Sequence, residues 1–249
     1  MIYRLLITIL LVLVTPLVMG TPNFKVVYYD GFPPYSYKNE AGQMTGILVD
    51  IVTEVIEKQM GLNVVHKGYP WGRAQRMVFN GQADAFISVP TDARLQHVSI
   101  SDTPVFVGPI NLFTYRHHPG LDILMRVSDT EGLRAFQILD YIGNGWGEAN
   151  LPQNQYTRSL TPNISNALQM LAKKRGDVVV TDKVVARYFI AKHQLQDAII
   201  EIPTTLDIVS FSLCISNQSP HLGILAAFSK KITQFRQQGG EQSVLEKYR

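Results

Sequence analysis

The chain has 249 residues, with 23 Lys and Arg against 20 Asp and Glu, and hydrophobic residues make up 46% of it. The formal charge of +3 is small and spread along the chain, and no basic cluster interleaves with aromatic residues, so nucleic-acid binding is not predicted. Cys214 is the single cysteine. An internal disulfide is therefore excluded, which in a secreted chain fits a bacterial periplasm better than a disulfide-built extracellular scaffold.

The first twenty residues have the layout of a secretory signal peptide. One positive charge at Arg4 precedes the apolar run 5–14, and the segment closes with small residues at Gly20. A transmembrane anchor is the alternative, but the apolar run is short and Pro16 interrupts it. We expect cleavage near Gly20 and a mature, monomeric protein in the periplasm.

The mature chain begins with an alternation of strands and helices. In chain order we predict a strand at 24–29, a loop at 31–35, a helix at 47–60, a strand at 63–66, a helix at 71–80 and a strand at 83–89. The apolar residues of the first helix recur at helical spacing, and two prolines make the loop unable to pair in a sheet. This order predicts a parallel α/β sheet.

A second series of the same kind follows. Its predicted elements are strands at 105–115 and 137–142, a glycine-rich turn at 143–147, a strand at 155–160, a helix at 162–174, a strand at 178–181, a helix at 183–192, a strand at 208–216 and a helix at 222–237. Two α/β lobes are therefore expected, the first from residues 21–114 and 207–249 and the second from residues 115–206. Two lobes joined by two short crossings leave a cleft between them.

Arg94 lies where a carboxylate site is expected. The strand at 83–89 ends at Pro90, and Thr91 or Asp92 caps a short helical turn that carries Arg94. A guanidinium just past a strand end holds a carboxylate through two parallel charge-assisted hydrogen bonds. The alternative is a surface arginine paired with a nearby acid.

Four segments together resemble one known family. They are FPPYSYKNEAGQMTGILVDIV, GQADAFISVPTDAR followed by SDTPVF, GDVVVTDKVVARYFI, and SPHLGILAAFSKKITQFRQQGGEQSVLEKY. In this order and spacing they resemble the bacterial extracellular solute-binding proteins of family 3, which serve polar amino-acid uptake systems. The resemblance covers nearly all of the mature chain. It implies a periplasmic-binding-protein-like fold in which two α/β lobes close on a ligand by hinge motion.

The same resemblance implies the partners and the charged groups of the cleft. A small carboxylate ligand, such as an amino acid, and an ABC-type permease in the inner membrane are the implied partners, without cofactor or metal. Arg94 matches the arginine that holds the ligand α-carboxylate, and Ser88 matches a backbone or hydroxyl contact. Asp182 matches the acid that takes the α-ammonium, although its alternative role is the N-cap of the helix that starts at Lys183.

Three aromatic residues complete the predicted site. Phe32 and Trp71 stand where the family places aromatic residues that stack on the ligand, with local packing as the alternative for both. Trp146 lies in the turn at 143–147, where a small hydroxyl residue usually follows the first glycine. A tryptophan in the cleft would fill space and displace hydrogen-bonding groups, so it bears on the identity of the ligand.

Two other functions use the same frame, namely sensor input and periplasmic catalysis of the cyclohexadienyl dehydratase type. The enzyme would need an acid or base beside Arg94, and the candidates are His97 and Glu148, neither of which lies in a recognisable motif. The sequence has no HExxH, CxxC, nucleophile elbow or phosphate loop. We therefore expect a binding protein without catalytic residues, and a free-standing sensor protein stays open as an alternative.

Overall fold

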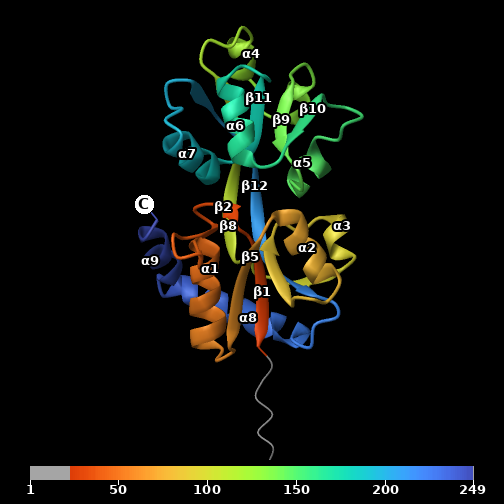
Figure 1. Cartoon of the computed structure of the whole chain (residues 1–249), viewed down its shortest axis with the longest axis vertical. Coiled ribbons are helices and arrows are strands. Elements are labelled where there is room, and N and C mark those ends of the chain that lie inside the picture. The colour runs from red at the N-terminus through yellow and green to blue at the C-terminus, as the bar shows by residue number, and fades with distance from the viewer. Residues whose placement is uncertain (1–22, 249) are drawn as a thin grey trace, which may run out of the picture.

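Two α/β lobes are stacked along the long axis of the molecule, and two long strands run from one lobe into the other (Figure 1). The structure is a computed structural model that describes residues 23–248. The predicted signal peptide at residues 1–20 and its cleavage site lie outside the described residues. The α/β class predicted from the alternation of strands and helices is confirmed.

The sheet of the first lobe is centred on β1 (Phe24–Tyr29). β1 pairs in parallel with β5 (Val64–Tyr69) on one side and with β6 (Ala85–Ser88) on the other. Its side chains alternate between two clusters: Val26 packs in the cluster that contains α1, and Val27 packs in the one that contains α2. The strand is covered on both faces, which explains its nearly continuous apolar sequence.

The helices of the first lobe come from both ends of the chain. They are α1 (Ile47–Val52), continued by the π-helical η1 (Thr53–Gln59), α2 (Trp71–Phe79), α3 (Asp92–Leu95), η3 (Leu222–Ile224), α8 (Leu225–Gln237) and α9 (Gly240–Glu246). Figure 1 shows α1 and α2 on opposite sides of the sheet. A short strand, β7 (Val98–Ile100), follows α3.

The second lobe repeats the arrangement without repeating the sequence. Strand β9 (Ile138–Tyr141) lies between β10 (Arg158–Thr161) and β11 (Val178–Asp182), and all three are parallel. Its helices are α4 (Leu121–Leu124), η2 (Thr130–Leu133), α5 (Gly145–Asn150), α6 (Ile164–Ala172) and α7 (Lys183–Lys192). The carboxyl ends of β9 and β11 line the space between the lobes. In α/β folds this end of the sheet is where ligands bind.

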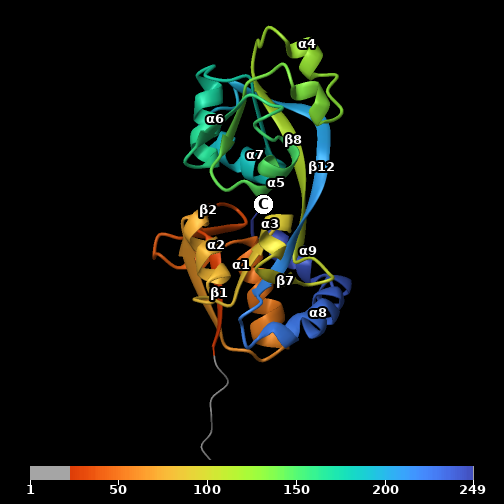
Figure 2. The same ribbon diagram turned by 90° about the vertical axis from the view of Figure 1, so that its right-hand side faces the viewer.

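The connection between the lobes is an antiparallel pair of long strands, β8 (Phe106–Tyr115) and β12 (Ile199–Ser216), which Figure 2 shows along one side of the molecule. β8 pairs with β11 over Ile110–Thr114, whereas β12 pairs with β6 over Ser212–Ile215. The pair therefore joins the strands of the two lobes into one continuous sheet, in the order β10-β9-β11-β8-β12-β6-β1-β5. The lobe boundaries proposed from the sequence, at 114/115 and 206/207, stay a prediction.

The parallel arrangement predicted for the strands of residues 24–89 is confirmed, because β1 pairs in parallel with β5 and β6. The complete sheet is mixed, because β8 and β12 run antiparallel to each other and to their neighbours β11 and β6. One prediction about local structure is corrected. The expected loop at 31–35 contains paired residues, since β2 (Gly31–Phe32), β3 (Ser36–Lys38) and β4 (Met44–Thr45) form a small separate sheet. The prolines lie in the turn between β2 and β3, where they remove no ladder donor.

The glycine-rich turn at 143–147 also differs from expectation, because its second half is the start of α5. Cys214 is fully buried in β12, as predicted.

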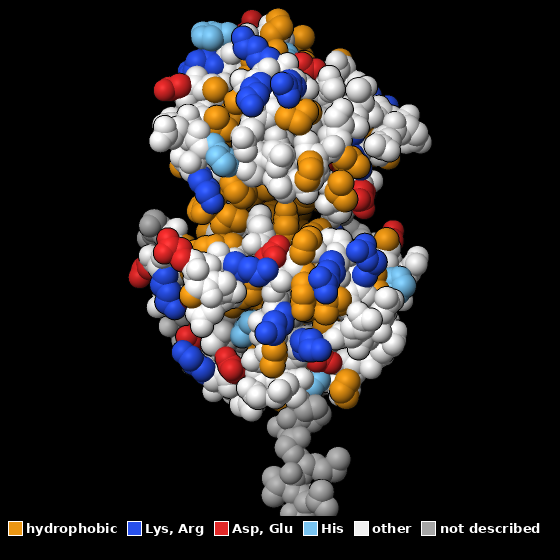
Figure 3. Space-filling model, viewed as in Figure 1, with side chains coloured by type: hydrophobic (Ala, Val, Ile, Leu, Met, Phe, Trp, Pro, Cys, Tyr) orange, Lys and Arg blue, Asp and Glu red, His pale blue; other side chains and the backbone are white. Residues whose placement is uncertain are grey.

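No helix within residues 23–248 is both long enough and apolar enough to cross a bilayer. Figure 3 shows hydrophobic side chains gathered at the waist between the lobes, while acidic and basic side chains are scattered over both.

Candidate ligand-binding site

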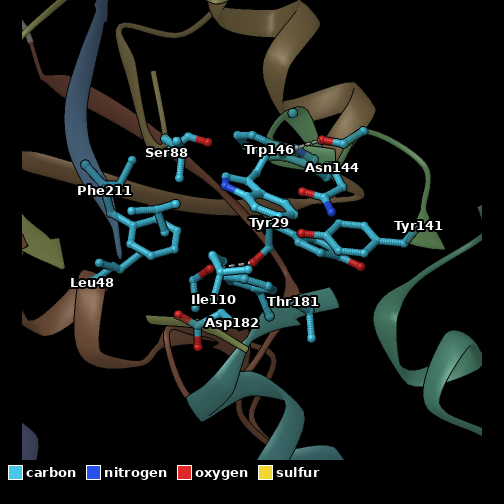
Figure 4. Close-up of a pocket in the computed structure, with 18 of the residues that line it drawn as sticks. Tyr29, Leu48, Ser88, Ile110, Tyr141, Asn144, Trp146, Thr181, Asp182 and Phe211 are labelled. Carbon is cyan, nitrogen blue, oxygen red and sulfur yellow. Dashed lines mark hydrogen bonds between the residues drawn. The ribbon is translucent and has the colours of Figure 1, made fainter. Parts of the chain in front are cut away.

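A cavity of about 60 Å³ lies between the lobes, where their parallel strands end. One water molecule needs roughly 10–15 Å³ on this measure, so a few would fit. The residues that the sequence predicted for ligand binding all line this cavity, namely Phe32, Trp71, Ser88, Arg94, Trp146 and Asp182. Figure 4 shows how these walls come from strands and turns of both lobes. The roles assigned to the residues stay predictions.

Arg94 projects into this cavity from the short helix α3. Thr91 is the N-cap of α3, and its hydroxyl accepts a hydrogen bond from the backbone N–H of Arg94 (3.4 Å). The guanidinium is held by Nε donating to Gln75 Oε1 (2.9 Å) and by Nη1 donating to the Val89 carbonyl (2.7 Å). Its Cζ atom lies 5.3 Å from the Trp71 ring centroid. The side chain is thus held in position by groups of the protein itself.

The charge of Arg94 has no carboxylate partner within residues 23–248. Arg94 is only 5% exposed, and its described hydrogen bonds go to neutral oxygens. Burial lowers the pKa of the guanidinium below its usual value. Because a buried cation is unfavourable without a counter-charge, the site favours an anionic guest. The alternative of a surface arginine paired with a nearby acid is therefore wrong.

Asp182 ends strand β11 on the opposite side of the cavity. Its Oδ1 accepts hydrogen bonds from the backbone N–H groups of Val184 (2.8 Å) and Val185 (3.1 Å), so it is the N-cap of α7. Its Oδ2 accepts a hydrogen bond from the hydroxyl of Tyr35 (2.9 Å). Burial raises the pKa of this carboxyl to about 6. Oδ2 retains one lone pair, so a further donor can still be accepted.

Three hydrogen bonds join the lobes across the cavity. The indole N–H of Trp71 and the guanidinium of Arg94 both donate to the carbonyl of Gly143, at 3.0 Å and 3.3 Å. The third is the bond from Tyr35 to Asp182. These contacts hold the lobes close together around the cavity. They also explain why the space between the lobes is small.

A buried ion pair supports the turn that carries Gly143 and Trp146. Asp140 Oδ1 accepts hydrogen bonds from the Tyr141 N–H (2.7 Å) and from Asn144 Nδ2 (2.8 Å), and Oδ2 lies 3.7 Å from Arg158 Nε. Arg158 also donates to the carbonyls of Gly147 and Leu151, which lie within and just after α5. The position of Trp146, whose indole N–H donates to Asp207 (2.6 Å), depends on this support.

Sequence analysis missed several groups that shape the site. Gln75 holds Arg94, and its signal is the spacing of four residues from Trp71, which places both on one face of α2. Tyr35 donates to Asp182 from a distant loop, for which the sequence offers no local signal. Asp140 and Arg158 pair through the parallel register of β9 and β10, for which the sequence offers no local signal.

The acid and base candidates for catalysis lie elsewhere. His97 is exposed and stacks on Phe79, with ring centroids 4.5 Å apart, and Glu148 is exposed on α5. Neither lines the cavity. Within the described part of the chain, no three His, Cys, Asp or Glu side chains are grouped as a metal ion would need.

The buried carboxyl of Asp182 should make the free energy of unfolding depend on pH. A pKa of about 6 in the folded protein, against 3.8 normally, means that the folded state binds the proton more tightly. The stabilisation by this group is therefore present below about pH 4 and is lost as the pH rises through 6, at a cost of about 3 kcal/mol. Asp182→Asn keeps a good N-cap residue but removes the buried charge.

Asp182→Asn should therefore raise the melting temperature of the ligand-free protein at pH 7.5, and the gain should vanish near pH 4. Thermal melts across this range, with the exposed Asp122→Asn as control, measure it. A gain of equal size at all pH values would contradict the assignment to the buried carboxyl.

Solved structures of low sequence identity share the fold. A histidine kinase sensor domain with similarity to periplasmic binding proteins matches with a TM-score of 0.78 at 20% identity, covering 91% of this chain and 95% of that one. A mutant of the arginine-binding protein ArgBP from T. maritima gives 0.73 at 19% identity, covering 91% and 94%. An ancestral arginine-binding protein bound to glutamine gives 0.74 at 20% identity, covering 92% and 98%.

The family comparison covers almost the whole described chain. No curated protein matches the chain in sequence. The model of the bacterial extracellular solute-binding proteins, family 3, matches residues 24–249. The periplasmic-binding-protein-like fold implied by the four sequence segments is confirmed by the solved structures. The chain therefore belongs to the bacterial extracellular solute-binding proteins of family 3.

Proposed function

We propose that this protein captures a small carboxylate-bearing ligand, an amino acid or a related compound, in the cavity between its lobes. The observation that carries the proposal is the buried guanidinium of Arg94, which faces the cavity without a carboxylate partner in the described chain. Three of its five N–H groups donate to protein oxygens, so two are left for a ligand carboxylate. Such a pair is strong because it is desolvated on both sides.

The α-ammonium of an amino acid would take the remaining lone pair of Asp182 Oδ2, beside Tyr35. Arg94 belongs to the first lobe and Asp182 to the second, so a zwitterion contacts both charges only when the lobes are together. This division supports ligand capture by closure. We further propose that the protein acts as a monomer in the periplasm and delivers its ligand to an ABC-type permease, a role supported by the fold it shares with the substrate binding protein of an amino acid ABC transporter.

Binding without turnover fits the groups around the cavity. His97 and Glu148, the acid or base candidates, lie outside it, and the family is described as one of solute-binding proteins. The sensor alternative draws on the fold it shares with a histidine kinase sensor domain, and no group in the cavity favours it.

The test is recovery of the ligand from protein secreted into a bacterial periplasm. Mass spectrometry of the small molecules released on unfolding should identify a carboxylic acid in stoichiometric amount, and calorimetry should show that it rebinds at one site per chain. Incubation with prephenate and with arogenate should give no product. Sustained turnover, or a released compound without a carboxylate, would contradict the proposal.

A further inference from the structure

We infer that the ligand of this cleft carries one carboxylate, at most one amine beside it, and a side chain that is uncharged and mainly apolar or aromatic, so that acids with a charged side chain are rejected. The inference rests on the proposed function, because it assumes that a carboxylate occupies Arg94. It follows from the charges, the hydrogen bonds and the walls of the cavity, each of which limits what the rest of the ligand can be.

The charge balance of the cavity leaves no partner for a third ligand charge. Its lining residues include two charged side chains, Arg94 and Asp182. An α-carboxylate and an α-ammonium would use both. A guanidinium or ammonium on the ligand side chain would then lack an anion, and a second carboxylate would lack a cation. Leaving a charge buried without its partner costs enough to lower affinity roughly 100-fold or more.

Asp207 and Asp30, which lie outside the lining, are already engaged, and Glu148 is exposed to solvent on α5. Asp207 Oδ2 accepts the indole N–H of Trp146 (2.6 Å), and its Oδ1 accepts the N–H of Ile208 (2.7 Å). Asp30, on a groove that adjoins the cavity at Tyr29 and Trp71, is paired with Lys38 at 2.7 Å. A basic ligand side chain that reached either one would have to replace an existing partner.

Asp140, which supports the turn at 143–147, also has its partners within the protein. One of its oxygens accepts two hydrogen bonds, and the other faces Arg158. The cation of that pair is not available to a second ligand carboxylate either, because Arg158 is buried and donates to the carbonyls of Gly147 and Leu151. Neither member of this buried pair is therefore available to a second charge on the ligand.

The residues that line the cavity suit a ligand with an apolar or aromatic side chain. Aromatic residues line the cavity at Tyr29, Phe32, Trp71, Tyr141, Trp146 and Phe211, and aliphatic residues at Leu48, Ile87, Val89, Ile110 and Val209. Figure 4 shows the rings of Tyr29, Tyr141, Trp146 and Phe211 around the space. Aromatic side chains pack well against the edge or the face of an aromatic ring on the ligand. Burial of the ligand's apolar surface adds to the affinity.

Two polar side chains of the lining are directed to protein acceptors instead of the ligand. Asn144 donates its amide to Asp140 (2.8 Å), and the hydroxyl of Ser36 donates to the carbonyl of Tyr29 (2.7 Å). Trp146, noted in the sequence as a space-filling residue in the turn, forms part of the apolar wall.

The experiment is a calorimetric titration of the secreted protein, freed of bound small molecules by unfolding and refolding. The probes are L-phenylalanine and L-leucine, 3-phenylpropionate as the acid without an amine, and L-arginine, L-lysine and L-glutamate as charged acids. We expect an apolar probe to bind at least 100-fold more tightly than every charged one. The comparison of L-phenylalanine with 3-phenylpropionate shows whether the amine contributes.

Two results would overturn the inference, and they differ in what they say of the proposed function. Tighter or equal binding of L-arginine, L-lysine or L-glutamate would disprove the apolar class while leaving carboxylate capture intact. Failure of all probes to bind a correctly refolded protein would count against both. Circular dichroism and melting of the refolded sample establish that the fold has returned.

Discussion

Arg94→Ala should lower the affinity for the carboxylate ligand by roughly 30-fold to several thousand-fold, which corresponds to about 2–5 kcal/mol for the loss of a desolvated charge partner. The guanidinium is preorganised by Gln75, Val89 and Trp71, so the wild-type protein spends little entropy in holding the carboxylate. Calorimetry with the recovered ligand measures the effect.

Two further variants sharpen this result. Arg94→Lys retains the charge but not the planar fork, so binding should be recovered only in part. Arg73→Ala is the control. Arg73 lies on the same helix as Gln75, but its side chain is exposed and its Cζ atom lies 4.7 Å from the ring centroid of Tyr69. If Arg94→Ala bound the ligand like the wild type and melted at the same temperature, Arg94 would have a structural role only.

Gly145→Ala should lower the affinity about 5- to 150-fold by preventing the lobes from meeting. A methyl group on Gly145 would come within 2.7–2.9 Å of the guanidinium atoms of Arg94, which belongs to the other lobe. Gln75 and Val89 hold that guanidinium in place, so the lobes must separate or Arg94 must move. Either response disturbs the carboxylate site.

Small-angle scattering with and without the ligand, combined with calorimetry, tests this expectation. The wild type should become more compact on binding, and the Gly145→Ala variant should compact less at saturation. Gly223→Ala is the matched control, because a methyl group there meets no atom within 4 Å. Wild-type affinity and compaction in the Gly145→Ala variant would show that this approach of the two lobes is not part of the binding state.

The sequence by itself determined the features that depend on local patterns. The period of apolar residues located most strands and helices, and the order Pro90, Thr91, Asp92 located the capped turn of Arg94. Three of the four family segments carry Phe32, Ser88, Arg94 and Asp182, which line the cavity. Trp71 and Trp146, which line it too, lie outside the four segments. Such signals survive in a single sequence since neighbouring residues generate them.

The tertiary structure decided the partners of those residues. Gln75 and Arg94 lie 19 residues apart, and Tyr35 and Asp182 lie 147 apart, so no local pattern relates either pair. The pairing of β8 with β12 joins the two sheets and makes them mixed, which a strand pattern without register cannot reveal. Whether Arg94 meets a carboxylate of its own protein is likewise set by the packing of distant elements, and in the described chain that packing gives it neutral oxygen partners only.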